Sequence, residues 1–208
     1  MKINNNTKKF IYLISPNKIY NTELFYRQLE SILKLRKIYF FQLRLKSSKR
    51  KQILQIGKKV KILCRKYGAK FIINDDPLMA KLLRADGCHL GQKDMKFFKA
   101  KNLIKKKIIG ITCHNSKILI KRFIKFNPSY IAIGSFFKSK TKKVKYRADI
   151  NLLKYAKTIT KIPIVAIGGI NNKNYKKLLL NNANFLAISG YIWNNKKYKP
   201  YEAIRKFK

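Results

Sequence analysis

Eight short apolar runs, each followed by a segment with helical periodicity, constrain the fold of this chain more than any other feature. Most of the runs are continuously apolar rather than alternating, which is typical of parallel strands buried on both faces. The segments between them repeat apolar residues at helical spacing. The runs are Phe10–Ile14, Tyr39–Leu43, Phe71–Ile73, Cys88–Leu90, Ile108–Ile111, Tyr130–Ile133, Ile164–Ile167 and Phe185–Ile188.

The alternation continues through all 208 residues without a linker rich in Pro, Gly or Ser. It predicts one α/β domain over residues 1–208, folded as a closed (β/α)8 barrel, the TIM barrel. An open doubly wound sheet is the structural alternative. In a closed barrel of this kind, the residues that act on substrates gather where the strands end.

The net charge of +42 comes from 50 Lys and Arg against 8 Asp and Glu. A polyanion partner such as nucleic acid is one interpretation. However, only nine of the fifty cations are Arg, the usual reader of guanine, and the lysines are spread over the whole length. We therefore interpret the charge as compositional drift and expect no nucleic-acid partner. The few acids become informative where they lie in apolar segments.

The cysteines and the apolar segments indicate the compartment. Cys64, Cys88 and Cys113 are an odd set without CxxC spacing, and no apolar stretch reaches the length of a membrane span. We predict a reduced, cytoplasmic protein without a disulfide framework or a membrane segment.

Polar residues follow the second apolar run. If the strand continues, alternation places Gln42, Arg44 and Lys46 on one side of it. One amide and two cations suit diphosphate or another polyanion. A frayed strand end with solvated cations explains the same pattern, and the residues alone do not decide between the two.

The ends of the third and fourth runs carry acids. Asp75 and Asp94 are separated by one strand–helix step, so neighbouring strand ends bring both carboxylates toward one cation. Mg²⁺ typically takes one or two carboxylates and completes its shell with phosphate oxygens and water. We predict a magnesium site there, and we interpret Asp76, just before Pro77, as a helix cap.

Two further candidates are assigned structural roles. His89 lies within an apolar run, and we interpret it as a packed core histidine rather than a metal ligand. Cys113 and His114 are neighbours on a predicted strand, so their side chains point to opposite sides and do not form a nucleophilic pair.

The last three runs end in residues suited to phosphate. Hydroxyls alternate with lysines from Lys138 to Lys142, Gly168-Gly169 follows the seventh run, and Ser189-Gly190 follows the eighth. Backbone N–H groups after strands seven and eight form the common phosphate site of such barrels. We predict a second phosphate site here.

The motifs together resemble the thiamine-phosphate synthase family from Gln42 to Trp193. The matching stretches are QLRLK (42–46), Asn74-Asp75, HLGQKD (89–94), GITCH (110–114), FFKSKTK (136–142) and AIGGI (166–170). The chain departs from the family pattern at four positions. It has Leu45 for Glu, Thr112 for Ser, Lys138 for Pro and Ser139 for Thr.

The resemblance implies a transferase that joins 4-amino-2-methyl-5-hydroxymethylpyrimidine diphosphate to a thiazole or carboxythiazole phosphate, with Mg²⁺ and no protein nucleophile. It implies that Asp75 and Asp94 hold the metal. It assigns the pyrimidine diphosphate to Gln42, Leu43, Arg44, Leu45, Lys46, Asn74, Thr112 and Lys142, and the thiazole phosphate to Ser139, Lys140, Thr141, Gly169, Ile188 and Ser189. The alternatives are a related thiazole tautomerase, a basic nucleic-acid-binding protein and an inactive remnant.

Overall fold

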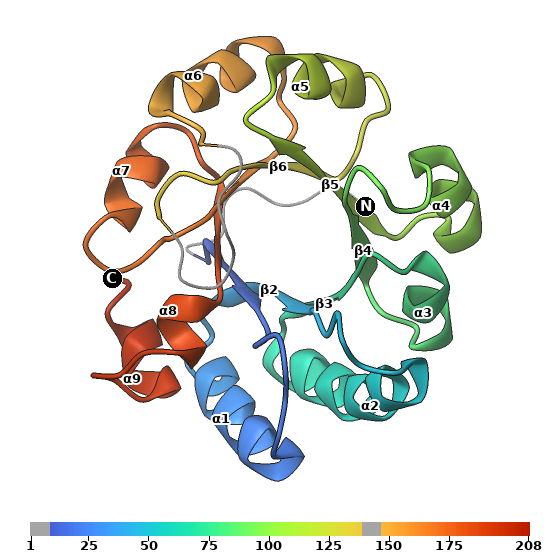
Figure 1. Cartoon of the computed structure of the whole chain (residues 1–208), viewed down its shortest axis with the longest axis vertical. Coiled ribbons are helices and arrows are strands. Elements are labelled where there is room, and N and C mark those ends of the chain that lie inside the picture. The colour runs from blue at the N-terminus through green and yellow to red at the C-terminus, as the bar shows by residue number, and fades with distance from the viewer. Residues whose placement is uncertain (1–8, 139–146) are drawn as a thin grey trace.

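The computed structural model describes residues 9–138 and 147–208 and confirms the closed barrel. Eight parallel strands pair in chain order, and β8 pairs with β1 to close the ring (Figure 1). The open doubly wound sheet is therefore excluded. The strands are β1 (Ile11–Ile14), β2 (Ile38–Leu43), β3 (Lys70–Asn74), β4 (Gly87–Leu90), β5 (Ile108–His114), β6 (Tyr130–Gly134), β7 (Ile164–Ile167) and β8 (Phe185–Ile188).

Helices surround the barrel, as the view down its axis shows (Figure 1). Side chains cap several of them: Asp76, Ser116 and Asp149 each accept a hydrogen bond from the backbone N–H three residues further on. The helices are α1 (Thr22–Lys34), α2 (Arg50–Tyr67), α3 (Pro77–Leu82), α4 (Phe97–Ile104), α5 (Lys117–Ile124), α6 (Ile150–Ile159), α7 (Tyr175–Leu180), α8 (Gly190–Trp193) and α9 (Pro200–Arg205). None of the helices in the described ranges is long and apolar enough for a membrane span.

All eight apolar runs coincide with strands, but the end of β2 differs from the prediction. β2 ends at Leu43, so Arg44 and Lys46 lie in the loop beyond it rather than on an alternating strand. β5 continues to His114, with an irregularity in its pairing between Thr112 and His114. The pleat of a strand therefore does not position the two cations.

The core has two layers. The outer layer lies between the strands and the helices and takes in Leu43, Leu45 and Ile188. The inner layer fills the barrel itself, so the barrel is a packed core rather than a pore. Its buried residues are Tyr12, Ile14, Phe40, Ile72, Ile108, Tyr130, Ala132, Val165, Phe185 and Ala187.

Aromatic rings dominate the inner layer. The Phe40 ring centroid lies 5.0 Å from Tyr12, 5.4 Å from Tyr130 and 5.1 Å from Phe185. These separations are within the range for favourable ring pairs. The Tyr130 ring occupies the space beside Gly110, where any added Cβ would overlap it. Thus one small residue on β5 makes room for a large one on β6.

The variant Gly110→Ala should lower the free energy of unfolding by about 1–3 kcal/mol or more, because the added methyl overlaps the Tyr130 ring in a packed interior. Urea unfolding followed by circular dichroism measures the change. Gly57→Ala is the matched control, because its Cβ would meet the flexible end of Leu83. We expect the control to stay within about 1 kcal/mol, since alanine also favours the helix. Equal losses in the two variants would contradict the packing argument.

Candidate active site

Two serines connect the strand ends around the barrel mouth. The buried Ser15 follows β1, and its backbone N–H donates to Gln42 O at 2.9 Å. The Ser15 Oγ accepts from Arg44 N at 2.9 Å, which anchors the loop after β2. From the other side of the ring, Ser189 Oγ donates to Ser15 O at 3.0 Å. The mouth is therefore braced where β8, β1 and β2 meet.

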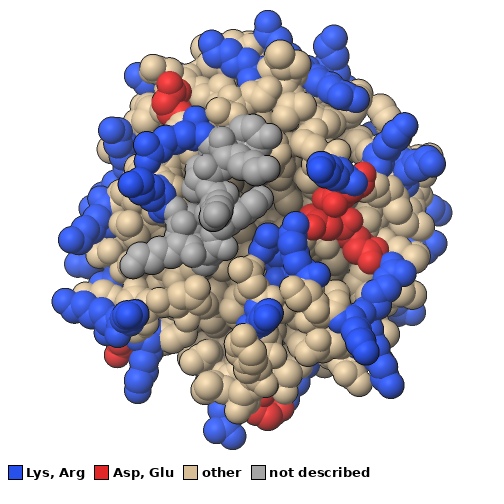
Figure 2. All heavy atoms as spheres, in the orientation of Figure 1, with Lys and Arg blue, Asp and Glu red and all other residues tan. Residues whose placement is uncertain are grey.

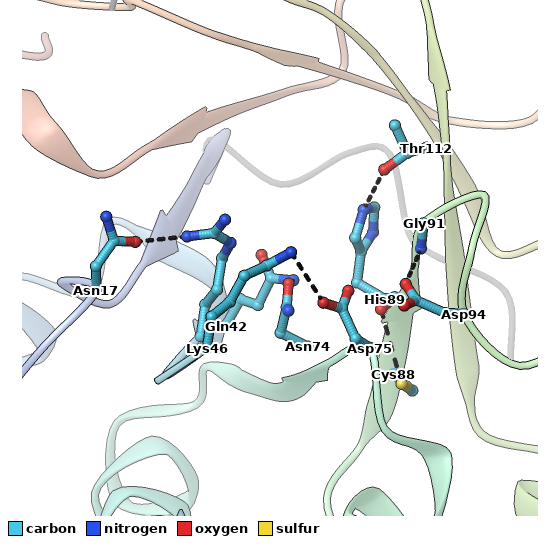
Figure 3. A network of polar contacts seen from close by, with 11 residues as sticks. Asn17, Gln42, Lys46, Asn74, Asp75, Cys88, His89, Gly91, Asp94 and Thr112 are labelled. Carbon is cyan, nitrogen blue, oxygen red and sulfur yellow. Dashed lines mark hydrogen bonds and ion pairs between the residues drawn. The ribbon is translucent and has the colours of Figure 1, made fainter. Parts of the chain in front are cut away.

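The first polar group at the mouth comes from β2 and β3. Gln42 is 2% exposed and points into the barrel, where its Nε2 donates to Asn74 Oδ1 at 2.9 Å (Figure 3). Arg44 donates to Asn17 Oδ1 in the loop after β1. Burial lowers the pKa of Arg44, and the charge of Asp75 opposes this effect. Arg44 stays cationic because its ordinary pKa lies far above neutrality.

The second group is the pair of acids predicted for magnesium. Asp75 has a left-handed φ of 63°, and its backbone N–H donates to His89 O at 2.8 Å, which turns the chain sharply after β3. Asp94 Oδ2 accepts from Gly91 N at 2.6 Å. Burial raises the pKa of Asp94; the Gly91 N–H opposes this, and hydrogen bonding to Asp75 together with its charge raises the pKa further. The two side chains therefore lie close enough at the mouth for Asp75 to act on Asp94 (Figure 3).

Lys46 joins the acidic pair to the basic side of the mouth. Its Nζ lies 3.3 Å from Asp75 Oδ2, and both side chains are partly exposed. A pair this exposed is worth only about 0–1 kcal/mol. Lys46 can therefore exchange its carboxylate partner for another anion at little cost.

The structure confirms that Asp76 caps a helix, the helix α3. Its Oδ1 accepts from Met79 N at 2.9 Å, and its Oδ2 lies 2.7 Å from Arg50 Nη2. Asp94 caps no helix, since α4 begins at Phe97 and its N-cap is Lys96.

A chain of four hydrogen-bonded side chains runs from the inner core to the mouth. The Tyr12 and Tyr130 hydroxyls lie 2.7 Å apart, and Tyr130 OH lies 3.0 Å from His89 Nδ1. His89 Nε2 then lies 2.8 Å from Thr112 Oγ1 on β5 (Figure 3). Gln92 donates to the backbone O of Thr112. The interpretation of His89 as a packed side chain holds, but the residue also touches the mouth.

Burial keeps the groups of this chain uncharged. It lowers the pKa of His89 from 6.5 to about 4, opposed in part by the charge of Asp75. Burial also raises the pKa of both Tyr12 and Tyr130 above the ordinary value. At neutral pH the four hydrogen-bonded side chains are therefore neutral hydroxyls and a neutral imidazole.

Cys113 is unsuited to nucleophilic attack. Its side chain is fully buried in the outer core layer, and burial raises its thiol pKa to about 12. A thiol in this state does not supply a thiolate near neutral pH.

The opposite side of the mouth is formed by β6, β7 and β8. Gly169 has a left-handed φ of 64°, and a Cβ there would overlap the backbone O of Lys138, so the loop after β6 lies tight against the loop after β7. Asn174 Nδ2 donates to Gly169 O at 3.1 Å. The predicted phosphate residues Ser139, Lys140, Thr141 and Lys142 lie outside the described residues.

Three predicted site residues face away from the mouth with their side chains. Leu43, Leu45 and Ile188 are between 2% and 5% exposed and pack in the outer core layer. Only their backbone atoms are left to meet a ligand.

The charges on this face are unevenly distributed. Figure 2 shows acidic atoms gathered at one place on this face, with Lys and Arg atoms close by. Asp75, Asp76 and Asp94 belong to the ends of β3 and β4, and Lys46 reaches Asp75 from the loop after β2. In the described part of the chain, no three His, Cys, Asp or Glu side chains are grouped to hold a metal ion. A cation here would thus share two carboxylates with other oxygen ligands.

Sequence reasoning missed Ser15, Asn17 and the hydroxyls of Tyr12 and Tyr130. Ser15 and Asn17 follow the first apolar run, and inspection of that strand end would have found them. The two tyrosines lie inside apolar runs, and a buried phenol needs a hydrogen-bond partner, which is the available signal.

Comparisons with known proteins show the family that the chain resembles in sequence and fold. The model of the family described as thiamine monophosphate synthase matches residues 11–192. The chain is 62% identical to the thiamine-phosphate synthase of Pelagibacter ubique over 208 residues, all of both chains. It is 42% identical to the thiamine-phosphate synthase of Saccharophagus degradans over 152 residues, 73% of this chain and 70% of that one. The solved thiamine phosphate pyrophosphorylase from Pyrococcus furiosus superposes with a TM-score of 0.83 at 25% identity, covering 96% and 94% of the two chains.

Acid should destabilise the fold through His89. The unfolded imidazole binds a proton near pH 6.5, whereas the folded one binds it only near 4, so acidification between these values favours unfolding. The contribution of neutral His89 to the free energy of unfolding is complete above about pH 6.5. Up to about 3 kcal/mol of this free energy is lost as the pH falls to 4. Urea unfolding of the wild type and of His89→Gln between pH 4 and 7.5 measures it. Parallel pH profiles for the two proteins would contradict the prediction.

Proposed function

The chain belongs to the thiamine monophosphate synthase family, and we propose that it joins 4-amino-2-methyl-5-hydroxymethylpyrimidine diphosphate to a thiazole or carboxythiazole phosphate, releasing pyrophosphate. It is a thiamine-phosphate synthase, a transferase of thiamine biosynthesis, by its full-length likeness to a relative of that name. The observation that carries the proposed chemistry is the cluster of Arg44, Lys46, Asp75 and Asp94 around one barrel mouth.

The β2 to β5 side of the mouth is the proposed place for the pyrimidine diphosphate. Arg44 and Lys46 supply positive charge for the diphosphate, and the backbone of Leu43 and Leu45 lies beside them. Gln42, Asn74 and Thr112 supply neutral polar groups deeper in the mouth. Lys142 completes the proposed set. This division suits a ligand with a charged end and a flat, hydrogen-bonding ring.

Mg²⁺ is the cation that this donor set fits. The charge of Asp75 raises the pKa of the Asp94 carboxyl, so a cation between the two side chains would be stabilised by both. Two carboxylates with room for phosphate oxygens and water match the usual magnesium shell. When bound, Mg²⁺ would neutralise negative charge on the diphosphate.

The β6 to β8 side is the proposed place for the thiazole phosphate. Gly169, Ser189 and the backbone of Ile188 lie at the ends of β7 and β8, which pair directly. The proposed set also includes Ser139, Lys140 and Thr141. Strand ends seven and eight are the common phosphate site of this fold.

The reaction then needs little covalent chemistry from the protein. The bond between the pyrimidine methylene carbon and the diphosphate oxygen breaks, and pyrophosphate leaves with the electron pair. Arg44 and Lys46 stabilise the charge that accumulates on it. The thiazole nitrogen forms the new bond to the methylene carbon. Binding both anionic substrates in one mouth brings the reacting atoms together, and this proximity supplies the rest of the rate acceleration.

The alternatives from the sequence have less support. A thiazole tautomerase has no use for paired acids beside two diphosphate-binding cations, yet Asp75, Asp94 and Lys46 lie together here. We also propose that the protein acts in the cytoplasm. Its three cysteines are free and buried, as expected for a protein that needs no disulfides.

We expect Mg²⁺-dependent release of pyrophosphate when both precursors are supplied. Asp75→Asn should reduce this rate about 100-fold or more, because it removes one carboxylate of the metal pair. Asparagine tolerates the left-handed conformation at this position, so the fold should survive. A coupled pyrophosphate assay with magnesium titration measures the rate.

Asp76→Asn is the matched control for that experiment. Asp76 is the adjacent carboxylate, it caps α3, and asparagine caps helices equally well. The rate of this variant should stay close to that of the wild type. If Asp75→Asn keeps the wild-type rate and magnesium dependence, the metal assignment is wrong.

The high charge should not translate into specific binding of nucleic acid. We expect any affinity for a short DNA or RNA duplex to fall steeply with salt and to vanish near physiological ionic strength, because dispersed lysines act through counterion release alone. Fluorescence anisotropy over a salt series measures it. Tight binding that persists at physiological salt would favour the nucleic-acid alternative.

A further inference from the structure

The hydrogen-bonded chain through the barrel has a direction that the donors and acceptors determine. A tyrosine hydroxyl donates one proton, and a neutral imidazole donates from one nitrogen and accepts at the other. In the described residues, the hydroxyl of the buried Tyr12 has Tyr130 OH as its hydrogen-bond partner. Tyr12 must therefore donate to Tyr130 if its proton is to be satisfied.

The next links follow from the first. Because Tyr130 OH accepts from Tyr12, its own proton is directed to His89 Nδ1 at 3.0 Å. His89 Nδ1 then carries no proton, so Nε2 carries it and donates to Thr112 Oγ1 at 2.8 Å. Every buried donor in the chain has an acceptor in this arrangement.

The opposite arrangement leaves a buried donor unsatisfied. If His89 Nδ1 carried the proton, Tyr130 would accept it and donate to Tyr12, whose own proton would then lack an acceptor in the described part of the barrel. A doubly protonated imidazole has the same consequence. A buried donor without a partner costs more than a hydrogen bond contributes, so this state is disfavoured.

We propose that Tyr130 holds His89 as its Nε2–H tautomer, which makes the Thr112 hydroxyl a hydrogen-bond donor toward the barrel mouth. Since Thr112 Oγ1 accepts from His89, its proton is free to turn to a ligand. The ligand atom must then be an acceptor, as the ring nitrogens of an aminopyrimidine are. This last step rests on the proposed function, which places the pyrimidine beside Thr112.

His89 and Tyr130 are thus positioning residues, and Thr112 is the group that touches substrate. Stacking supports the role of Tyr130, because its ring lies parallel to that of His89, with an interplanar angle of 9° and centroids 5.7 Å apart. The imidazole is held by its face as well as by both nitrogens. A hydroxyl on β5 and an imidazole ring held at both nitrogens together define one donor direction.

Nitrogen NMR of the histidine side chains tests the tautomer directly. The chain has two histidines, so labelling with ¹⁵N-histidine and one His114→Gln spectrum assign the signals of His89. We expect a protonated Nε2 and an unprotonated Nδ1 in the wild type at neutral pH. A protonated Nδ1 would overturn the inference.

Two phenylalanine variants separate the hydroxyl effect from packing. Tyr130→Phe removes the donor to His89 Nδ1, and we expect the ¹⁵N signal of this unprotonated nitrogen to shift because its hydrogen bond is lost. Tyr12→Phe removes a hydroxyl from the same inner layer, yet leaves Tyr130 with His89 as its acceptor, so the Nε2–H form should persist. An unchanged Nδ1 signal in Tyr130→Phe, or loss of the Nε2–H form in Tyr12→Phe, would contradict the proposal.

The donor role of Thr112 is tested by substrate binding. Thr112→Val removes the hydroxyl at nearly constant shape and should raise the KM for the pyrimidine diphosphate roughly tenfold, the scale of one hydrogen bond. Thr112→Ser keeps the donor and should stay within about threefold of the wild type. Pyridine analogues that lack one ring nitrogen each complete the cycle. One of these analogues should bind the wild type more weakly than the parent pyrimidine diphosphate does. The same analogue and the parent should bind Thr112→Val equally well, because the donor is already missing there.

The outcomes distinguish this inference from the proposed function. If every pyridine analogue binds the wild type as tightly as the parent diphosphate, the donor role of Thr112 is wrong while the synthase activity stands. If the wild type releases no pyrophosphate from both precursors, the proposed function is wrong while the NMR result on His89 still decides the tautomer.

Discussion

The contact between the Tyr130 ring and the bare backbone of Gly110 is the constraint on which the inner barrel depends. Eight short strands leave a space that must be filled at interior density, and here four aromatic rings fill much of it. Tyr130 reaches the centre only because β5 carries no side chain at Gly110. The same ring presents a hydroxyl to Tyr12 and to His89, so the packing of the core also orders the mouth.

The mouth carries acidic and basic side chains close to one another. Asp75 lies close enough to Asp94 to raise its pKa, and Lys46 forms an ion pair with Asp75. Such an exposed ion pair adds little stability, and this makes it easy to rearrange. The protein therefore holds opposite charges close to each other at small cost, and a metal-bound diphosphate would satisfy both.

The eight apolar runs predicted the closed barrel correctly because burial on both faces leaves a continuous apolar signal that neighbouring residues alone determine. The acidic pair was also predictable, since residues that follow adjacent parallel strands must meet at one end of the barrel. The placement of Arg44 and Lys46 was predicted less well. β2 ends at Leu43, and the hydrogen bond that Arg44 N donates to Ser15 Oγ, far away in the sequence, anchors the loop beyond it.

The sequence by itself determined the closed barrel of eight strands, and it predicted which end of the barrel carries the candidate site and which residues supply its charge. Each of these follows from local periodicity and from the rule that parallel strands end together. Only the tertiary structure revealed the series of hydrogen bonds that runs from Tyr12 to Thr112. It also decided that the side chains of Leu43, Leu45 and Ile188 point outward. Hydrogen bonds between residues 23 to 118 positions apart depend on how strands pack across the barrel, which no local pattern encodes.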